Sequence, residues 1–417
     1  MVRTGLLLDH NASRALRAAA GDVSCHLVGG ALRDRLLGLS SHDIDAVVEH
    51  SALSIAERLS NELPARLVTL GDGSRTAYRL VGAGQVLDIW DRQRCLLGDE
   101  LARRDFTVNS IALDLLTGRV VDPLGGHVDA CRKLLRANRP GTFARDPLRV
   151  LRLARLAAEL PGFTADADTI VWAREATPAI SEVASERVRV ELSSLLRARR
   201  PEVGLEILAR LDVYPRLWLR TAGAPAPPGG WLAERLWRLQ QVSSWLMTRL
   251  PTSDAPLDRE LVLHAILLET LGSERSSEAL EHLLSIGYVA RSAGKSIGRI
   301  LTCRELPRDQ KAQRWWLHES GELWTAALAF SGVYEASRGQ LATWRTGAEA
   351  MIRLVRTRGD EIFDPRPLLD GSGIAELLGV EPGPRIGQAV AAVRKAQVEG
   401  SIGSMSEAEA LVRSLEE

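Results

Sequence analysis

Two aspartates stand two residues apart in a segment that can place them on one surface. Asp43 and Asp45 flank Ile44 and lead into the apolar run Ala46–Val48. Side chains alternate across a β-strand, so this spacing directs both carboxylates to the same face. Mg²⁺ suits such a pair, because it is bound through one or two carboxylates together with phosphates and water. We therefore predict a metal site with Asp43 and Asp45 as its ligands and as catalytic residues.

A glycine turn lies thirteen residues upstream of the aspartates. An apolar run ends at Val28, Gly29 and Gly30 follow, and a helix-start pattern continues through Arg33. Backbone N–H groups at such a turn can hold a triphosphate, and the Arg33 guanidinium can add a charge-assisted hydrogen bond. A strand, a glycine turn and a helix, followed by a strand with Asp-x-Asp, form a far more specific pattern than either motif alone.

A third acidic residue, Asp88, lies in the later apolar run Val86–Trp90. Three carboxylates on adjacent strands can hold two metal ions, one to activate an attacking 3′-hydroxyl and one to neutralise a leaving pyrophosphate. We count Asp88 as a candidate catalytic residue on this basis. The alternative is an ordinary acidic residue near a strand end, and the sequence leaves both interpretations open.

The elements that must position these residues alternate between strand and helix patterns in the first third of the chain. Short β-rich runs are separated by glycine turns at 71–73 and 82–84, and Ser51–Leu63 has helical spacing. From about Arg139 onward the pattern is helical, with breaks at 221–230 and 363–367. The expected fold class is α+β, a mixed sheet with helices followed by helical regions. The predicted strands are Cys25–Val28, Ile44–Val48, Arg66–Leu70, Thr76–Val81 and Val86–Trp90.

Composition excludes several classes of protein. A chain of 417 residues is long enough for several domains, and its formal net charge is zero. The four cysteines are far apart and form no Cys-x-x-Cys pair, which argues against a disulfide framework or a zinc ribbon and is typical of a reducing cytoplasm. No apolar run reaches the roughly 18 to 20 residues of a membrane span. Between Asp129 and Arg152 seven basic residues face two acidic ones, an excess that attracts phosphates unless it only reflects an arginine-rich composition.

Several ordered motifs resemble the nucleotidyltransferase superfamily that includes DNA polymerase β. More closely, they resemble the class II tRNA CCA-adding enzymes and the related bacterial poly(A) polymerases, and the resemblance covers nearly the whole chain. The matching segments are Leu27–Asp34 with Asp43–Asp45, Arg103–Ser110, Asp122–Gly126 through Arg136, Phe143–Arg152, Glu186–Leu192, Leu368–Gly373, Pro382–Gly387 and Ala392–Gly400.

The resemblance implies a polymerase β-like head that holds the metals, a neck that selects the nucleotide, and a body and tail that hold tRNA. Its expected boundaries are 1–22 for an N-terminal extension, 23–137 for the head, 138–200 for the neck, 201–362 for the body and 363–417 for the tail. It further implies Mg²⁺ as cofactor and the tRNA 3′ end, CTP and ATP as partners; it makes no prediction of oligomeric state. The nucleotide-binding residues that it implies are Gly29, Gly30, Arg33, Asp34, Arg104, Asp105, Asn109, Asp146, Arg149 and Arg152.

The choice of nucleotide can be argued from Asp146 and Arg149. They lie three apart around Pro147, where Asp146 suits a helix N-cap or first turn, so both side chains can meet one planar ligand. A carboxylate only accepts hydrogen bonds and a guanidinium only donates them. Cytosine and adenine present an amino donor beside a ring acceptor, whereas guanine and uracil present a carbonyl in place of that donor. The pair therefore predicts acceptance of C and A. The alternative is a capping aspartate with a salt bridge to Arg149.

The chain departs from the family pattern at two places. Arg145 stands where the family usually has glutamate, which bears on nucleotide selection. The connection from Asp91 to Arg103 is short, whereas full CCA-adding members carry a longer loop there, and this favours addition of CC only. His264 lies in an apolar surround without a partner acid and is expected to be a core residue rather than a ligand.

Two other functions remain beside tRNA 3′-end addition. A bacterial poly(A) polymerase that acts on general RNA would share the head and neck motifs. A non-catalytic RNA-binding relative is disfavoured, because Asp43, Asp45, Arg104 and Asp105 are all retained.

Overall fold

The computed structural model describes residues 11–41, 43–71, 76–82, 85–92, 95–213, 217, 231–250, 257–269, 273–381 and 383–415. The chain divides into two compact units, Met1–Tyr214 and Pro215–Glu417. Most of the predicted glycine turns at 71–73 and 82–84, and all of the break at 221–230, lie outside the described residues. The finer division into head, neck, body and tail stays a prediction.

A seven-stranded mixed sheet forms the centre of the first unit. Its strand order is β3-β4-β5-β2-β1-β6-β7, in which β2 runs parallel to β5 and the other neighbours are antiparallel. The five predicted strands are confirmed and differ from the observed ones by at most one residue at either end. The strands are β1 Cys25–Val28, β2 Asp43–Val48, β3 Arg66–Leu70, β4 Ala77–Gly82, β5 Gln85–Asp91, β6 Ala112–Asp114 and β7 Val120–Val121.

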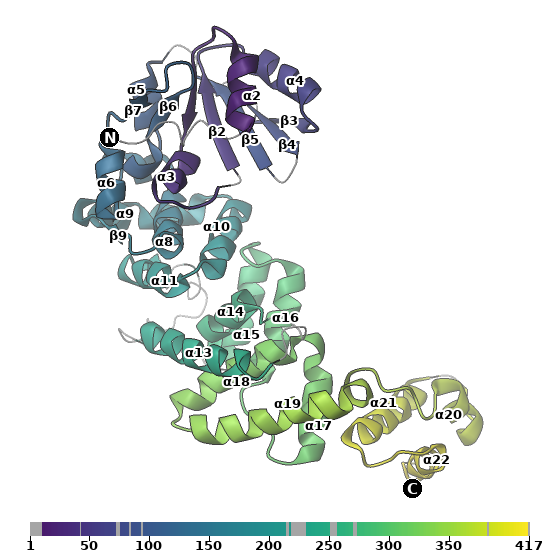
Figure 1. Cartoon of the computed structure of the whole chain (residues 1–417). Helices are drawn as coiled ribbons and strands as arrows, with labels where there is room; N and C mark the ends of the chain where they lie inside the picture. The colour runs from purple at the N-terminus through teal and green to yellow at the C-terminus, as the bar shows by residue number, and fades with distance from the viewer. Residues whose placement is uncertain are drawn as a thin grey trace. The chain divides into compact units, whose positions relative to one another are not determined.

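The alternation of side chains along β2 explains how the sheet exposes its carboxylates. Ile44, Ala46 and Val48 point into a core that helices α2 (Asn11–Ala20) and α4 (Ala52–Glu62) cover (Figure 1). Val47 points the other way, into a smaller apolar cluster with Val28, Leu101 and Ala112. Asp43 and Asp45 share the face of Val47, because residues two apart lie on the same side of a strand.

Helices complete the first unit after the sheet. The amphipathic α8 packs its apolar face against α10 and α11. The expectation of an entirely helical chain beyond Arg139 is wrong at β9 (Thr164–Ala165), which pairs in parallel with β8 (Leu134–Leu135). A strand of two residues is too short to show the two-residue alternation of apolar and polar side chains by which strands are predicted. The helices are α3 Gly30–Leu36, α5 Leu97–Ala102, α6 Gly126–Arg132, α7 Thr142–Arg145, α8 Arg149–Glu159, α9 Ala167–Ala176, α10 Ser185–Arg197 and α11 Pro201–Arg210, with 3₁₀ turns at Thr107–Asn109 and Thr177–Glu182.

The second unit is helical throughout its described part (Figure 1). His264 is buried in α14 among apolar neighbours, which confirms it as a core residue, and burial lowers its pKa to about 4. The predicted break at 363–367 separates α19 from a C-terminal group of three helices with its own apolar core. The helices are α13 Trp231–Met247, α14 Arg259–Glu269, α15 Ser273–Ser285, α16 Arg291–Thr302, α17 Gln310–Ser320, α18 Trp324–Ser337, α19 Leu341–Phe363, α20 Gly371–Leu378, α21 Pro384–Glu399 and α22 Met405–Ser414.

None of the helices in the described residues is long and apolar enough to span a membrane. Residues 1–10 of the predicted extension lie outside the described residues, and residues 11–22 form α2 and the turn that follows it.

Candidate active site

Three aspartates, which we call the carboxylate row, lie together on the sheet: Asp43 and Asp45 on one face of β2, and Asp88 beside Asp45. Asp45 on β2 lies directly beside Asp88 on β5, and Arg79 on β4 lies opposite Asp88. Burial raises the pKa of Asp45 above its ordinary value, and the charges of Asp88 and Asp43 raise it further, while Arg104 opposes the shift. The sequence prediction that Asp43 and Asp45 share a face therefore agrees with the strand register, and Asp88 lies within electrostatic reach of Asp45.

Gly29 brings the glycine turn against this row. Its backbone has φ 86° and ψ −150°, a combination that side chains rarely tolerate. A Cβ atom at Gly29 would lie 2.5 Å from Arg104 Nη1 and 2.6 Å from Asp45 Oδ2. Glycine is required here both for the turn and for the close approach of the Asp45 carboxylate and the Arg104 guanidinium to the backbone.

Arg104 connects the carboxylates with the segment that follows α5. Its Nη1 lies 3.5 Å from Asp45 Oδ2 and 3.4 Å from the carbonyl oxygen of Asn109. The guanidinium also stacks over the Trp90 ring, 5.5 Å from the ring centroid. These contacts place a permanent positive charge next to Asp45.

Arg33, on α3, is buried. Its Nε and Nη2 both donate to Asp34 Oδ1, at 2.8 and 2.7 Å, and its Nη1 donates to Asn109 Oδ1 at 2.6 Å. Asp34 thus acts in this structure as the charge partner of Arg33. The contact with Asn109 joins the glycine turn to the segment around Arg104.

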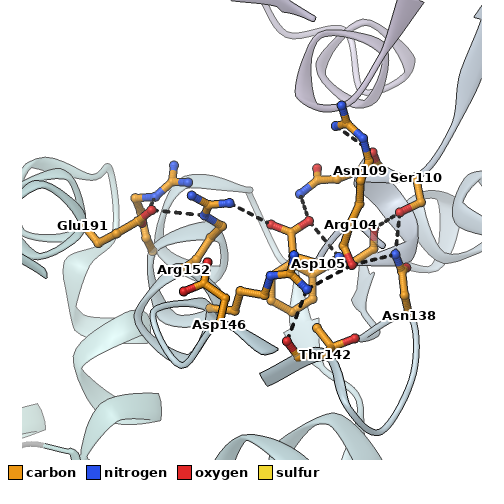
Figure 2. Close-up of polar contacts among 12 residues, drawn as sticks. Arg104, Asp105, Asn109, Ser110, Asn138, Thr142, Asp146, Arg152 and Glu191 are labelled. Atoms are coloured by element: carbon orange, nitrogen blue, oxygen red, sulfur yellow. Dashed lines mark hydrogen bonds and ion pairs between the residues drawn. The ribbon is translucent and has the colours of Figure 1, made fainter. Parts of the chain in front are cut away.

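Asp105 is the buried centre of a network that links the sheet domain to α8 and α10. Its Oδ1 accepts hydrogen bonds from the Phe106 N–H and from Asn109, and its Oδ2 lies 3.4 Å from Arg152 Nη1 (Figure 2). Burial alone would raise the pKa of Asp105, but Arg152 and these hydrogen bonds outweigh it and lower the pKa. Asp105 is therefore a charged structural anchor for the Arg104 segment.

Three arginines lie along one face of α8. Arg149, Arg152 and Arg155 are spaced by three residues, while the apolar residues between them face the core. All three line a cavity of about 690 Å³ together with Asp45, Arg104 and other side chains of the first unit. Of the predicted site residues, those that line this cavity are Gly30, Arg33, Asp45, Arg104, Asp105, Asn109, Arg149 and Arg152.

Arg149 lies in the first turn of α8, as the sequence predicted, but Leu148 and not Asp146 is the N-cap residue. Asp146 is extended, with φ −150° and ψ 94°, and α8 begins only at Arg149. The residue before a proline is disfavoured in helical conformation, so Pro147 keeps Asp146 out of the helix. The carboxylate of Asp146 accepts a hydrogen bond of 2.8 Å from Arg187 on α10, in place of the alternative salt bridge to Arg149.

Arg149 instead binds the backbone of the neighbouring segments. Its Nη2 donates to the carbonyl oxygen of Arg103 at 2.9 Å, and its Nη1 donates to those of Arg104 and Thr142 at 3.3 and 3.2 Å. Burial lowers its pKa, although the charges of Asp105 and Asp146 oppose the shift. Its Nε is buried and has no hydrogen-bond partner among the described residues.

Three residues that support the site had no assigned role in the sequence analysis. Glu191 on α10 accepts hydrogen bonds from Arg152 and Arg155, and Asn138 donates to Ser110 and to the backbone of Leu101 and Arg104 (Figure 2). The three-residue spacing of Arg149 and Arg152 continues to Arg155 and was a signal for it, and Glu191 lies within a motif matched in the sequence analysis. No local pattern indicates Asn138, because its partners are 28 or more residues away.

Sequence family models match two parts of the chain. Residues 25–136 match the "Poly A polymerase head domain", and residues 162–218 match the "Probable RNA and SrmB- binding site of polymerase A". An A-adding tRNA nucleotidyltransferase of Deinococcus radiodurans is 31% identical and aligns over 93% of this chain and 94% of its own. A CC-adding tRNA nucleotidyltransferase of Thermus thermophilus is also 31% identical, over 92% of both chains.

The chain belongs to the class II CCA-adding tRNA nucleotidyltransferase and poly(A) polymerase family. As a tRNA nucleotidyltransferase, it has the fold of that family. A Thermotoga maritima CCA-adding enzyme complexed with tRNA superposes with a TM-score of 0.68 at 22% identity, over 99% of this chain and 98% of that one. A CCA-adding enzyme in complex with ATP superposes with a TM-score of 0.71 at 21% identity, over 98% and 95% of the two chains. The α+β fold class is thereby confirmed.

Proposed function

We propose that this tRNA nucleotidyltransferase adds C and A to the 3′ end of tRNA from CTP and ATP without a nucleic-acid template. The observation that carries the proposal is the cavity in which Asp45, Arg104 and the arginines of α8 converge. The relatives support it, since they are described as A-adding and CC-adding tRNA enzymes. Solved structures of similar fold are described as complexes with ATP, CTP or tRNA.

The acidic pair fits Mg²⁺ as cofactor. Asp43 and Asp45 offer hard oxygen ligands on one face of β2, and Asp88 lies beside Asp45 on the neighbouring strand. In the described part of the chain no group of three acidic, histidine or cysteine side chains is arranged to bind a metal. The ligands proposed for Mg²⁺ are therefore Asp43 and Asp45. The chemistry that Mg²⁺ supplies when bound is activation of the 3′-hydroxyl and neutralisation of the leaving pyrophosphate.

The arginines provide the charge that the transfer requires. The 3′-hydroxyl of the RNA loses its proton to water as its oxygen forms a bond to the α-phosphorus, the bond from that phosphorus to the β-phosphate oxygen breaks, and pyrophosphate leaves. Arg104 and Arg152 line the cavity and are held by Asp45, Asp105 and Glu191, so their cations need little reorganisation to meet a triphosphate. Arg33, fixed by Asp34 and Asn109, is a third phosphate-binding candidate.

Nucleotide selection is assigned to Arg149 with Asp146. Arg149 lines the cavity, while Asp146 must exchange Arg187 for the amino group of the base. Leaving the half-buried Asp146 carboxylate or Arg149 guanidinium unpaired against G or U accounts for their rejection.

Replacing Arg149 with lysine is expected to reduce the preference for CTP and ATP over UTP and GTP by about tenfold, because lysine lacks the planar fork that binds several acceptors at once. The ratio of kcat/KM values for the four nucleotides on one tRNA transcript measures this. Arg58→Lys, on the exposed side of α4, is the matched control and should keep the wild-type ratio. An unchanged ratio in Arg149→Lys would contradict the assignment.

The proposed function is tested with tRNA transcripts that lack CCA or end in C or CC, each offered CTP, ATP or both. We expect incorporation into these transcripts and little into unrelated RNA. Addition of CC without A would follow from the short connection between Asp91 and Arg103, part of which forms α5 while residues 93–94 lie outside the described residues. Addition of A only to transcripts ending in CC would assign the reaction of the A-adding relative. Long A tails on unrelated RNA would overturn the tRNA assignment and favour a poly(A) polymerase.

A further inference from the structure

Arg79 and Asp88 form a two-bond ion pair at the end of the carboxylate row. Arg79 Nε donates to Asp88 Oδ1 at 2.8 Å, and Nη2 donates to Oδ2 at 2.7 Å. The two residues face each other in the antiparallel β4–β5 register, so the pair is set by the sheet itself. A fork-to-fork contact between a guanidinium and a carboxylate is strong and directional. Both oxygens of Asp88 are therefore engaged by a cation that the chain provides.

The pair also lies within reach of the proposed metal site. Asp88 is the register partner of Asp45, and its charge contributes to the raised pKa of Asp45. The pKa of Arg79 is raised, chiefly by its hydrogen bond with Asp88 and also by the charges of Asp43 and Asp45. Arg79 is thus a permanent positive charge close to all three carboxylates. In the strand order β4-β5-β2-β1, Arg79 on β4 lies on one side of Asp45, and β1 with the Gly29 turn lies on the other.

A metal ligand at Asp88 would conflict with this arrangement. A divalent cation bound to Asp88 would lie beside the Arg79 guanidinium, and two cations that share one carboxylate repel each other. Mg²⁺ does not need the third acid, because waters and substrate phosphates complete its coordination around one or two carboxylates. Asp43 and Asp45 have no comparable two-bond arginine partner among the described residues; Arg104 approaches Asp45 at 3.5 Å through a single nitrogen.

We infer that Asp88 is a positioning residue: it holds and neutralises Arg79 beside the Asp43–Asp45 metal site and does not bind the metal. The inference rests on the proposed metal-dependent function. It assigns the metal set of this chain to two aspartates, and it gives Arg79 the role of a fixed charge that limits the negative potential of the carboxylate row.

The test is a cycle of variants read by Mn²⁺ binding to the full chain, measured from the electron paramagnetic resonance signal of free Mn²⁺ without nucleotide or tRNA. Asp88→Asn leaves Arg79 uncompensated and should weaken Mn²⁺ binding by roughly fivefold to tenfold through charge repulsion. Adding Arg79→Met removes that charge, so the double variant should return to within about twofold of the wild type. Asp45→Asn, which removes a ligand, should weaken binding by about tenfold or more whether or not Arg79 is present.

Rescue in the double variant separates the two roles of Asp88, because deleting Arg79 cannot restore a lost ligand. If the double variant binds Mn²⁺ as poorly as Asp45→Asn, Asp88 is a ligand and the inference is overturned. A wild-type chain without an Asp45-dependent Mn²⁺ site overturns it as well. Far-UV circular dichroism checks the folding of each variant, and Arg79→Lys/Asp88→Asn, which keeps the positive charge, should remain as weak as Asp88→Asn. Failure of tRNA extension with intact Mn²⁺ binding would affect the proposed function alone.

Discussion

Replacing Asp45 with asparagine is expected to lower nucleotide addition by about a thousandfold, equivalent to about 4 kcal/mol of transition-state stabilisation. Two effects combine. The variant loses a charged metal ligand in the middle of the carboxylate row, and Arg104 loses the carboxylate that it contacts at 3.5 Å. Asparagine has nearly the same shape, so the packing of β2 against its neighbours is retained. Single-turnover incorporation of labelled CTP into a tRNA transcript measures the loss.

The matched control for Asp45→Asn is Glu57→Gln, which removes one carboxylate charge from the exposed side of α4. This helix covers the other face of the sheet, so the control should keep wild-type incorporation. Raising the Mg²⁺ concentration should recover part of the lost rate in Asp45→Asn, because weaker metal binding is then offset by mass action. Near-wild-type activity of Asp45→Asn would show that the chemistry takes place elsewhere in the molecule.

Much of the fold could be predicted because its signals are local. The five central strands have alternating or continuous apolar runs, and the two-residue period of β2 alone places Asp43 and Asp45 on one face. The strands β6, β7, β8 and β9 were not predicted. They span only two or three residues and are held by backbone hydrogen bonds, so little in their own sequence distinguishes them from loops.

The residues of the candidate site could be predicted from the sequence, but their hydrogen-bond and ion-pair partners could not. Most of the motif residues named from the sequence line one cavity. Arg79 pairs with Asp88 because of the cross-strand register of β4 and β5. Arg187, the partner of Asp146, lies 41 residues away on α10. Such contacts depend on tertiary packing, which spacing along the chain does not report. Pro147 was the available signal that Asp146 would be extended, since a residue before proline avoids the helical region.

Glu191 is the residue on which two of the cavity arginines depend. It is buried on α10, and its two oxygens accept separate hydrogen bonds from Arg152 Nε at 3.1 Å and Arg155 Nε at 2.7 Å. Arg152 also reaches Asp105, so Glu191 stabilises the whole connection from α10 through α8 to the Arg104 segment (Figure 2). Removal of Glu191 would leave two guanidinium groups with only part of their compensating charge.

Replacing Glu191 with alanine is therefore expected to lower the free energy of unfolding by about 3 kcal/mol, the low end for breaking a buried pair, because both arginines reach solvent and keep a second partner. Urea unfolding followed by far-UV circular dichroism measures this loss. Glu186→Ala is the matched control on the same helix: Glu186 is exposed and pairs loosely with Arg189, and surface pairs of this kind contribute little. Equal effects of the two variants would contradict the anchoring role. If Glu191 anchors Arg152 and Arg155, Glu191→Ala should also raise the KM for CTP of the folded protein without urea, since the two arginines would no longer be held at the cavity.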